Sequence, residues 1–288
     1  MIYDVVILGA GPAGISASLY AKRANLNVLV LYHGVSQLEK ADKIENYYGF
    51  VNGISGKDLY INGIEQAKNI GVEVVEKEIT DIEMAENSLF NIKASEEIFQ
   101  GKTVIIATGN KKLKPNIKGI DEFDGKGISY CAICDGFFYR NKNVVVIGNG
   151  QFAISEANDL ANVVSNLKIL TNGLDAPETN KYEVDIRKIK EIKGEQKVTA
   201  IVFEDGQEVQ VDGIFIAQGT AGGSDFAKKL GVVAKNDNLV VNENMETNIK
   251  GIFACGNLTG GLLQVNKAIY EGAKAGLQAV KYLKSLQK

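Results

Sequence analysis

A glycine-rich turn placed directly after an apolar strand restricts the fold of this 288-residue chain more than any other feature. The N-terminal segment reads IYDVVILGAGPAG, in which the strand runs into Gly9-x-Gly11-x-x-Gly14 and a helix is expected over about 15–24. In such a turn the first glycine allows the tight bend, the second lets the backbone approach a pyrophosphate, and the third lets the helix pack on the strand. The segment predicts a βαβ unit with an anion site at the helix N-terminus.

The same order returns in the second half of the chain. An apolar strand at 144–148 leads into Gly148-x-Gly150-x-x-Ala153, a helical stretch to about 164 and a further strand at 167–171. Two βαβ units of this kind predict an α/β fold made of two Rossmann-like, three-layer ββα domains of the dinucleotide-binding type.

The chain is expected to cross between these domains twice. The first crossing is predicted at the Lys-rich, Pro-containing stretch 111–119, and the second near 238–248, before a last apolar strand and a long helix. One domain should therefore consist of residues 1–111 and 241–288. The other, inserted in it, should consist of residues 112–240.

Composition excludes several classes of partner. A net charge of −3 and a pI near 5.5 argue against general binding to nucleic acid or to an anionic membrane surface. The N-terminus enters a strand without the basic and apolar regions of a signal peptide, and no run approaches the length of a membrane span. A cytoplasmic location is the resulting expectation.

The sharpest local motif is a C-x-x-C in the segment SYCAICDGFFYR. Cys131 and Cys134 lack further thiolate or imidazole ligands nearby, since Cys255 and His33 are the chain's other cysteine and histidine. No metal site is therefore expected, and redox cycling is the better interpretation of this spacing in a reducing compartment. Asp135 directly follows the pair and is the nearest candidate for proton transfer, with capping of the helix as its alternative role.

Neither glycine motif is followed by the acidic residue that usually holds a ribose. Tyr32 and His33 stand at that position after the first unit, while the second unit continues into TNGLD, beginning at Thr171. Arginine occurs at three positions only, 23, 140 and 187, so a multi-arginine clamp for a 2′-phosphate is absent here. The second motif is therefore expected to be degenerate for nucleotide binding.

Taken in order, these motifs resemble the low-molecular-weight flavin thioredoxin reductases. The resemblance rests on the turn at 9–14, ENYYG at 45–49, ATG at 107–109, CAICDG at 131–136, GNGQFA at 148–153 and GIFACGN at 251–257, and it spans essentially the whole chain. It implies an FAD-binding domain built from the two ends of the chain and an inserted NAD(P)-like domain that carries the cysteine pair.

The resemblance also assigns roles to residues. Cys134 would face the flavin, Cys131 would attack the disulfide of a thioredoxin, and Asp135 would handle the proton. The positions expected to bind FAD are Gly9, Gly11, Pro12, Ala13, Gly14, Tyr32, His33, Glu45, Asn46, Thr108, Gly109, Gly256, Asn257, Gln264 and Val265. A homodimer is likewise implied by the family alone.

Several positions depart from the family pattern. Asn257 replaces an aspartate, Tyr48 a proline, and Leu263 an arginine, while TNGLD stands where the family carries an arginine-bearing HRR-type motif. The loss of that motif is similar to the ferredoxin-dependent flavin thioredoxin reductases. We therefore expect reduced ferredoxin as electron donor, docked on basic groups of the chain. The candidate groups are Lys111, Lys112, Lys114 and Lys118, or Arg187, Lys188, Lys190 and Lys193.

Three alternatives stay open from the sequence. The chain could take its electrons from NADPH, it could oxidise a small dithiol and pass electrons to oxygen, or it could be a flavin-binding regulatory protein without turnover. The intact CAIC argues against the last of these.

Overall fold

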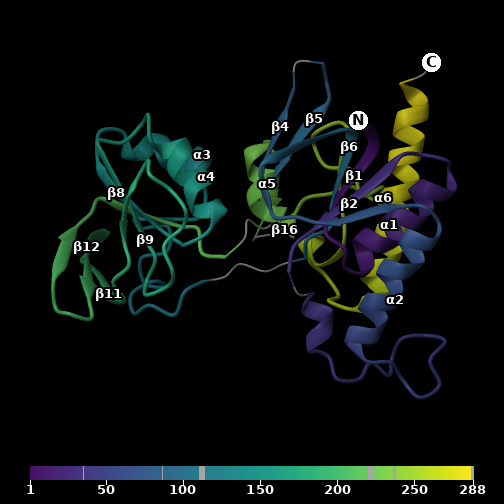
Figure 1. Cartoon of the computed structure of the whole chain (residues 1–288), viewed down its shortest axis with the longest axis horizontal. Helices are drawn as coiled ribbons and strands as arrows, with labels where there is room; N and C mark the ends of the chain where they lie inside the picture. Colours follow the sequence, from purple (N-terminus) through teal and green to yellow (C-terminus); the bar gives the residue numbers. More distant parts are fainter. Residues whose placement is uncertain (35, 86, 110–113, 220–222, 236–237, 287–288) are drawn as a thin grey trace. The chain divides into compact units, whose positions relative to one another are not determined.

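The computed structural model of the chain describes all residues except 35, 86, 110–113, 220–222, 236–237 and 287–288, together with the side chains of Cys134 and Ser224. It divides into two compact units. The first comprises Met1–Lys111 and Gly222–Lys288, and the second comprises Lys112–Ala221 (Figure 1).

The first unit is built on a seven-stranded sheet. Its order is β3-β2-β1-β6-β5-β4, with β17 also paired to β6. The strands β1, β2, β3, β6 and β17 are parallel, whereas β4, β5 and β6 form an antiparallel meander. The bounds are β1 Ile2–Leu8, β2 Val28–Tyr32, β3 Glu73–Glu76, β4 Ile79–Met84, β5 Phe90–Ala94, β6 Glu97–Ile106 and β17 Ile252–Ala254.

Helices cover one face of this sheet. Figure 1 shows α1 (Pro12–Arg23), α2 (Gly56–Asn69) and α6 (Val265–Ser285) on the same side. Alternate residues of the strands, among them Val5, Ile7 and Ile105, are fully buried against these helices, because successive side chains of a strand point to opposite faces. The shorter elements are η1 (Gln37–Lys40), α5 (Gly223–Lys229), β15 (Ala234–Lys235), β16 (Asn238–Leu239) and η3 (Gly256–Thr259).

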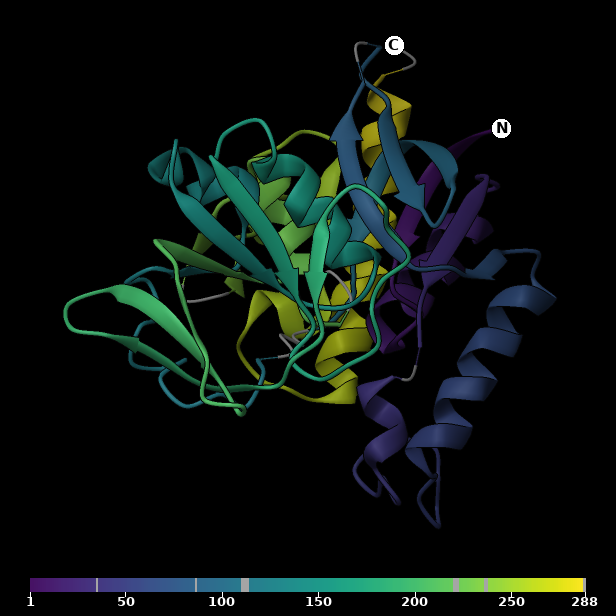
Figure 2. The ribbon, with the colours of Figure 1, turned by 60° about the vertical axis from the view of Figure 1, so that its left-hand side comes forward.

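The second unit repeats the layered arrangement on a smaller scale. A parallel sheet of order β10-β9-β8-β14-β7 lies between α3 and α4 on one side and the antiparallel sheet β11-β12-β13 on the other (Figure 2). The bounds are β7 Ile128–Ser129, α3 Ala132–Asp135, η2 Gly136–Tyr139, β8 Asn143–Ile147, α4 Gln151–Leu160, β9 Asn166–Leu170, β10 Glu183–Asp185, β11 Ile189–Gly194, β12 Val198–Phe203, β13 Glu208–Gln210 and β14 Gly213–Ile216.

Strand β8 is buried on both of its faces. Val144 and Val146 pack with the residues of α4, whereas Val145 and Ile147 pack with the antiparallel sheet. All four are buried, so the strand is a continuous apolar run rather than an alternating one. The predicted fold class, two Rossmann-like domains with the second inserted in the first, is confirmed.

Two details of the expected organisation differ in the structure. The second crossing lies at residues 221–222 rather than after residue 240, because α5 packs on β4 and on β16, within the first unit. The stretch 111–119 is not a free linker throughout, since Ile117 is buried in the core of the second unit and Lys118 bridges to Glu191. Lys111 and Lys112 lie outside the described residues.

Candidate functional site

The first glycine turn leaves space at only one of its three glycines. Gly9 has φ +108°, and a Cβ there would lie 2.5 Å from the carbonyl oxygen of Ala107. A Cβ at Gly14 would lie 1.9 Å from the carbonyl oxygen of Gly9. At Gly11, the residue before α1, an added Cβ would meet no atom of the described residues within 4 Å. The packing thus explains two glycines, and the third leaves the helix N-terminus open to a bound group.

Segments far apart in the sequence bring further predicted positions together in the first unit. Asn46 donates through Nδ2 to Oε1 of Gln264 at 2.9 Å, although 218 residues separate them. The hydroxyl of Thr108 accepts the amide of Gly223 at 2.8 Å. By contrast Glu45 is exposed and pairs with Lys43 at 2.6 Å. These contacts join Asn46 and Thr108 to residues of the C-terminal part of the chain.

A largely buried ion pair that the sequence did not indicate holds the segment after β17. Lys267 and Glu271 on α6 pair at 3.1 Å, and Glu271 also accepts the amide of Gly256 at 2.9 Å. Gly256 has φ +81°, and a Cβ there would lie 2.9 Å from the Cβ of Ala13 on α1. The i,i+4 spacing of the charges on an otherwise apolar helix face was the signal that could have found this pair.

The end of β2 gains a carboxylate from the neighbouring strand. Tyr32 pairs in register with Glu76 of β3, and Oε1 of Glu76 accepts the amide of Gly34 at 3.3 Å. Burial raises the pKa of Tyr32, and the charge of Glu76 raises it further. His33 is exposed. The acidic group that is missing after β2 is thus supplied by Glu76 of β3. Sequence reasoning missed this residue.

Cys131 lies at the head of the short helix α3 in the second unit and is disulfide-bonded. It is buried, and its amide donates to the hydroxyl of Ser129 at 3.1 Å. The carbonyl of Cys131 accepts the amide of Asp135 at 3.2 Å, which closes one helical turn. The side chain of Cys134 lies outside the described residues.

Two carboxylates contact the backbone and side chains around Cys131. Asp135 accepts the hydroxyl of Ser129 through Oδ2 at 2.6 Å. Of the two roles considered for Asp135, the side chain does not cap η2 in the described structure. Glu156 of α4 accepts the amide of Ala132 through Oε2 at 2.6 Å. Sequence reasoning missed Ser129 and Glu156, although an acidic residue on the apolar face of a helix was a usable signal.

Apolar side chains are exposed on the same short segment. Phe137 is 71% and Phe138 70% exposed, and Ile133 of α3 is 54% exposed. Exposed aromatic side chains that gather in one place are typical of protein interaction sites. Tyr139, in contrast, packs edge-on against Phe215 with ring centroids 5.3 Å apart, and anchors the segment to the sheet.

The polar side chains that follow the second βαβ unit bond to residues of their own unit. Asn172 has φ +56°, and its Oδ1 accepts the amide of Ile189 at 2.9 Å. The guanidinium of Arg187 donates to both carboxylate oxygens of Asp185 and lies 3.9 Å from the centre of the Phe203 ring. The hydrogen bond to Asp185, outweighing partial desolvation, raises the pKa of Arg187. This arginine is therefore engaged within its own unit.

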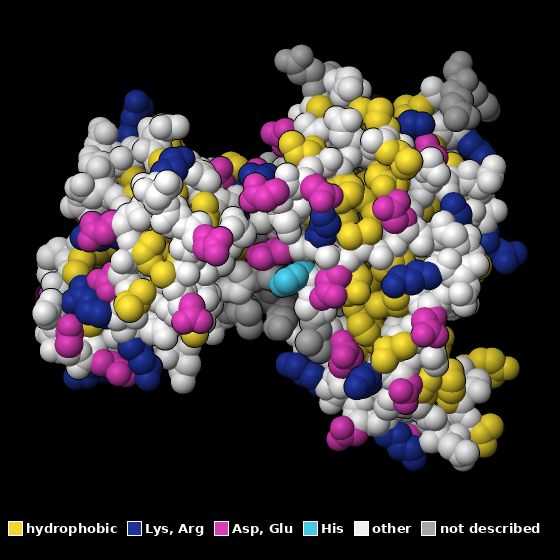
Figure 3. Space-filling model, in the orientation of Figure 1, with side chains coloured by type: hydrophobic (Ala, Val, Ile, Leu, Met, Phe, Trp, Pro, Cys, Tyr) yellow, Lys and Arg dark blue, Asp and Glu magenta, His cyan; other side chains and the backbone are white. Residues whose placement is uncertain are grey.

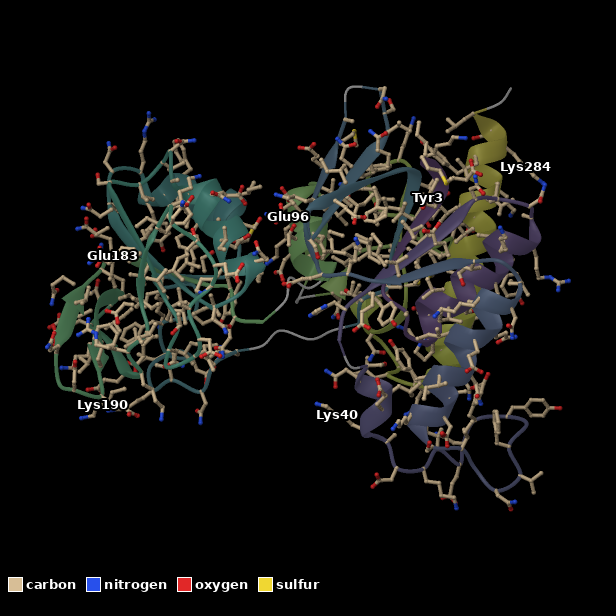
Figure 4. The ribbon with its side chains drawn as sticks, viewed as in Figure 1. Tyr3, Lys40, Glu96, Glu183, Lys190 and Lys284 are labelled. Carbon is tan, nitrogen blue, oxygen red and sulfur yellow. The ribbon has the colours of Figure 1, made fainter. Side chains whose placement is uncertain are left out.

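The two basic groups considered for ferredoxin docking are extensively ion-paired. Lys114 pairs with two aspartates, Lys118 with Glu191, and Lys193 with Glu208. On the face drawn in Figure 3, basic and acidic side chains alternate over this unit. Lys190, labelled in Figure 4, is exposed on β11. Of the members of these groups that the structure describes, Lys114, Lys118, Arg187, Lys188 and Lys193 each pair with a carboxylate, which compensates their charge.

The remaining cysteine adds no reactive group to the site. Cys255 is a free thiol and fully buried, and burial together with Glu271 raises its pKa, so it is a packing residue. Among the residues that the structure describes, no three His, Cys, Asp or Glu side chains gather as metal ligands. Within the same residues, no helix is long and apolar enough to cross a membrane.

Two glycine turns that follow parallel strands, with a disulfide-bonded cysteine in the inserted unit, define a two-domain redox protein of the dinucleotide-fold class. Comparison with known proteins gives the family. A model of the family described as pyridine nucleotide-disulphide oxidoreductase matches residues 3–272. Thioredoxin reductase from Listeria innocua is 34% identical over 306 aligned positions, covering 99% of this chain and 95% of that protein.

Solved structures agree with this. The atypical thioredoxin reductase TRi from Desulfovibrio vulgaris Hildenborough superposes with a TM-score of 0.89 at 36% identity, covering 98% of each chain. A ferredoxin-flavin thioredoxin reductase from Clostridium acetobutylicum has a TM-score of 0.69 at 32% identity, covering 99% of each chain. The chain belongs to the pyridine nucleotide-disulphide oxidoreductase family, and it is an FAD-dependent oxidoreductase that acts on sulfur groups.

Proposed function

We propose that this protein reduces the disulfide of a thioredoxin through Cys131 and Cys134, with electrons from reduced ferredoxin. The observation that carries the proposal is the disulfide-bonded Cys131 at the head of α3, with exposed Phe137 and Phe138 on the same segment. Relatives named thioredoxin reductase support thioredoxin as the substrate. The dithiol suits the chemistry, and the exposed aromatic side chains suit a protein substrate better than a small dithiol.

The first unit is the proposed FAD-binding domain. A pyrophosphate fits the N-terminus of α1, because no side chain caps this helix and the backbone at Gly11 can be approached closely. Asn46 and Gln264, joined by a hydrogen bond, and Thr108 and Asn257 supply polar groups for the rest of the cofactor. Tyr32, His33 and Glu76 lie at the strand ends proposed for the adenosine part. When bound, FAD supplies the electron pair that reopens the disulfide of the inserted unit.

Thiol–disulfide exchange between the reduced cysteine pair and thioredoxin balances in atoms and electrons. The thiolate of Cys131 attacks one sulfur of the thioredoxin disulfide, so that a mixed disulfide forms and a thioredoxin thiolate leaves. Cys134 then attacks Cys131, which restores the enzyme disulfide and releases the second thioredoxin thiol. Thioredoxin gains two electrons and two protons in this sequence. Asp135, oriented by Ser129, is the proposed group that delivers or removes protons at sulfur.

Ferredoxin is proposed as donor because the second nucleotide motif has lost its specificity groups. Asn172 bonds the backbone of Ile189, and Arg187 is held by Asp185. Two features of this region would still suit a nucleotide: a Cβ at Gly150 would lie 3.7 Å from the carbonyl oxygen of Gly219, and Oε1 of Gln218 is buried without a hydrogen-bond partner among the described residues. The ferredoxin-flavin relative from Clostridium acetobutylicum supports the ferredoxin version. The ion-paired lysines give it no added support.

Anaerobic titration of the FAD-loaded protein separates the donors. We expect reduced ferredoxin to bleach the flavin absorbance and then to support reduction of thioredoxin. Prompt bleaching by micromolar NADPH or NADH would contradict this and assign a nicotinamide donor. Oxygen uptake with a small dithiol, in the absence of thioredoxin, would contradict the reductase function itself.

A homodimer and a cytoplasmic location belong to the same proposal. The bridge between Ile44 and Ile54 closes a loop that exposes Tyr48 and Val51 almost completely, and an apolar loop of this kind is suited to a second copy of the chain. Sedimentation velocity at micromolar concentration tests the dimer. A monomer throughout that range would contradict it.

A further inference from the structure

The carboxylate of Glu156 is placed on the peptide that follows the redox cysteine. Glu156 is 1% exposed and lies on the buried face of α4, with Phe152, Ala153, Ala157 and Leu160. Its Oε2 accepts the amide of Ala132 at 2.6 Å, and Ala132 is the first residue of α3 and the neighbour of Cys131. The amide of Ala132, the first amide of the helix that follows Cys131, is thus bonded to a buried carboxyl group.

This contact bears on the redox chemistry of the cysteine. In a C-x-x-C at a helix start, free amides of the first turn stabilise a thiolate, and a stabilised thiolate favours the reduced form and makes the disulfide a stronger oxidant. A carboxyl group on the same amide takes up one of these donors, and in its ionised form it adds a like charge. Both effects destabilise the thiolate and therefore favour the disulfide, which makes the dithiol a better reductant.

We propose that Glu156 is a positioning residue that fixes the start of α3 through Ala132 and makes the Cys131 dithiol more strongly reducing. This inference rests on the proposed function, because it concerns the potential at which the same dithiol passes electrons to its substrate. Asp135, the last residue of α3, accepts the hydroxyl of Ser129 and is the other described carboxylate near Cys131. Glu156 acts on the dithiol through its hydrogen bond to the backbone of Ala132.

Glu156→Gln separates charge from shape. The amide oxygen of glutamine still accepts the Ala132 amide, while the charge is lost. Wild type and variant are equilibrated anaerobically in mixtures of dithiothreitol and its cyclic disulfide, and the thiols are then trapped with a maleimide and counted by mass spectrometry. We expect roughly tenfold displacement toward the dithiol in Glu156→Gln, equivalent to a potential about 30 mV higher. Iodoacetamide should alkylate the reduced variant faster at neutral pH.

The matched control is Glu195→Gln, in the same unit on an exposed turn, which should leave both readouts unchanged. If Glu156→Gln does not fold, Glu156→Asp and Glu156→Asn form a second pair of equal length, and the asparagine variant should have the higher potential. Equal potentials within either folded pair would overturn the inference. A wild-type dithiol that fails to reduce thioredoxin, while the variants still differ, would instead overturn only the proposed function.

Discussion

The ammonium of Lys267 lies 3.1 Å from the carboxylate of Glu271, and the pair encloses the segment that follows β17. The side chains are only 15% and 12% exposed. Lys267 donates to the carbonyls of Gly256 and Gly260 at 2.8 and 2.5 Å and to the hydroxyl of Thr259 at 2.9 Å. Since Gly256 and Asn257 are proposed FAD contacts, the ion pair holds a part of the cofactor site through the backbone.

Lys267→Met should therefore weaken both the first unit and its hold on FAD. It removes three hydrogen bonds and leaves the charge of Glu271 without its partner. Breaking a largely buried pair in this way costs about 3 kcal/mol. We expect a lower thermal midpoint of the FAD-free protein and a weaker affinity for added FAD, measured by scanning calorimetry and by flavin fluorescence quenching. Lys281→Met, at an exposed position of the same helix, is the control. An unchanged midpoint would show that the pair contributes no net stability.

The contact between Ser129 and Asp135 gives a prediction about turnover. Asp135→Asn keeps an oxygen that accepts the Ser129 hydroxyl but loses the ability to exchange a proton. We expect thioredoxin reduction to slow by roughly 10²- to 10⁴-fold, the usual range for a general acid or base. Ser129→Ala should slow it less, because Asp135 keeps its carboxylate. Rates are measured by stopped-flow from the pre-reduced enzyme. A Ser129→Ala effect larger than that of Asp135→Asn would make positioning, not proton transfer, the role of this pair.

The sequence predicted the parts of the fold that depend on local pattern. The glycine motif predicted the first turn, because close packing at Gly9 and Gly14 leaves no room for a side chain. Apolar runs such as 144–147 predicted the strands on both sides of each turn. The second crossing was placed about twenty residues too late. α5 and β16 carry no motif of their own, and only their packing on the first unit assigns them to it.

Contacts between distant segments could not be predicted from the sequence. Glu76 reaches the end of β2 only through the pairing of β3 with β2, and Glu156 reaches Ala132 only because α4 packs against α3. Likewise, a run of lysines predicts charge but not its compensation. The carboxylates that pair with Lys118 and Lys193 come from other strands.

The exposed phenylalanines beside Cys131 distinguish a protein substrate from a small one. Phe137→Ala and Phe138→Ala should each raise the KM for thioredoxin about tenfold, since truncation of an aromatic contact at a centre of binding costs more than 1 kcal/mol. The rate with a small aromatic disulfide should stay within about twofold of wild type. Ile186→Ala, an exposed apolar residue of the same unit, serves as control. Equal losses on both substrates would indicate damage to the dithiol segment and not to a docking surface.

The ion pair between Asp185 and Arg187 gives a prediction about how the stability of the second unit depends on pH. The hydrogen bond from Arg187 holds the pKa of the Asp185 carboxyl below its ordinary value of about 3.9. A carboxyl with a lowered pKa in the folded state contributes stability above the unfolded-state pKa, and this contribution is lost as the pH falls through the folded-state pKa. Asp185→Asn should therefore lower the thermal midpoint at pH 7 by a few degrees at most. The difference from wild type should shrink as the pH falls below about 4, when wild type loses the same charge. The exposed Asp175→Asn is the control. A gap between wild type and Asp185→Asn that stays constant from pH 7 to pH 3 would mean that the ionised Asp185 does not stabilise the fold through its pair with Arg187.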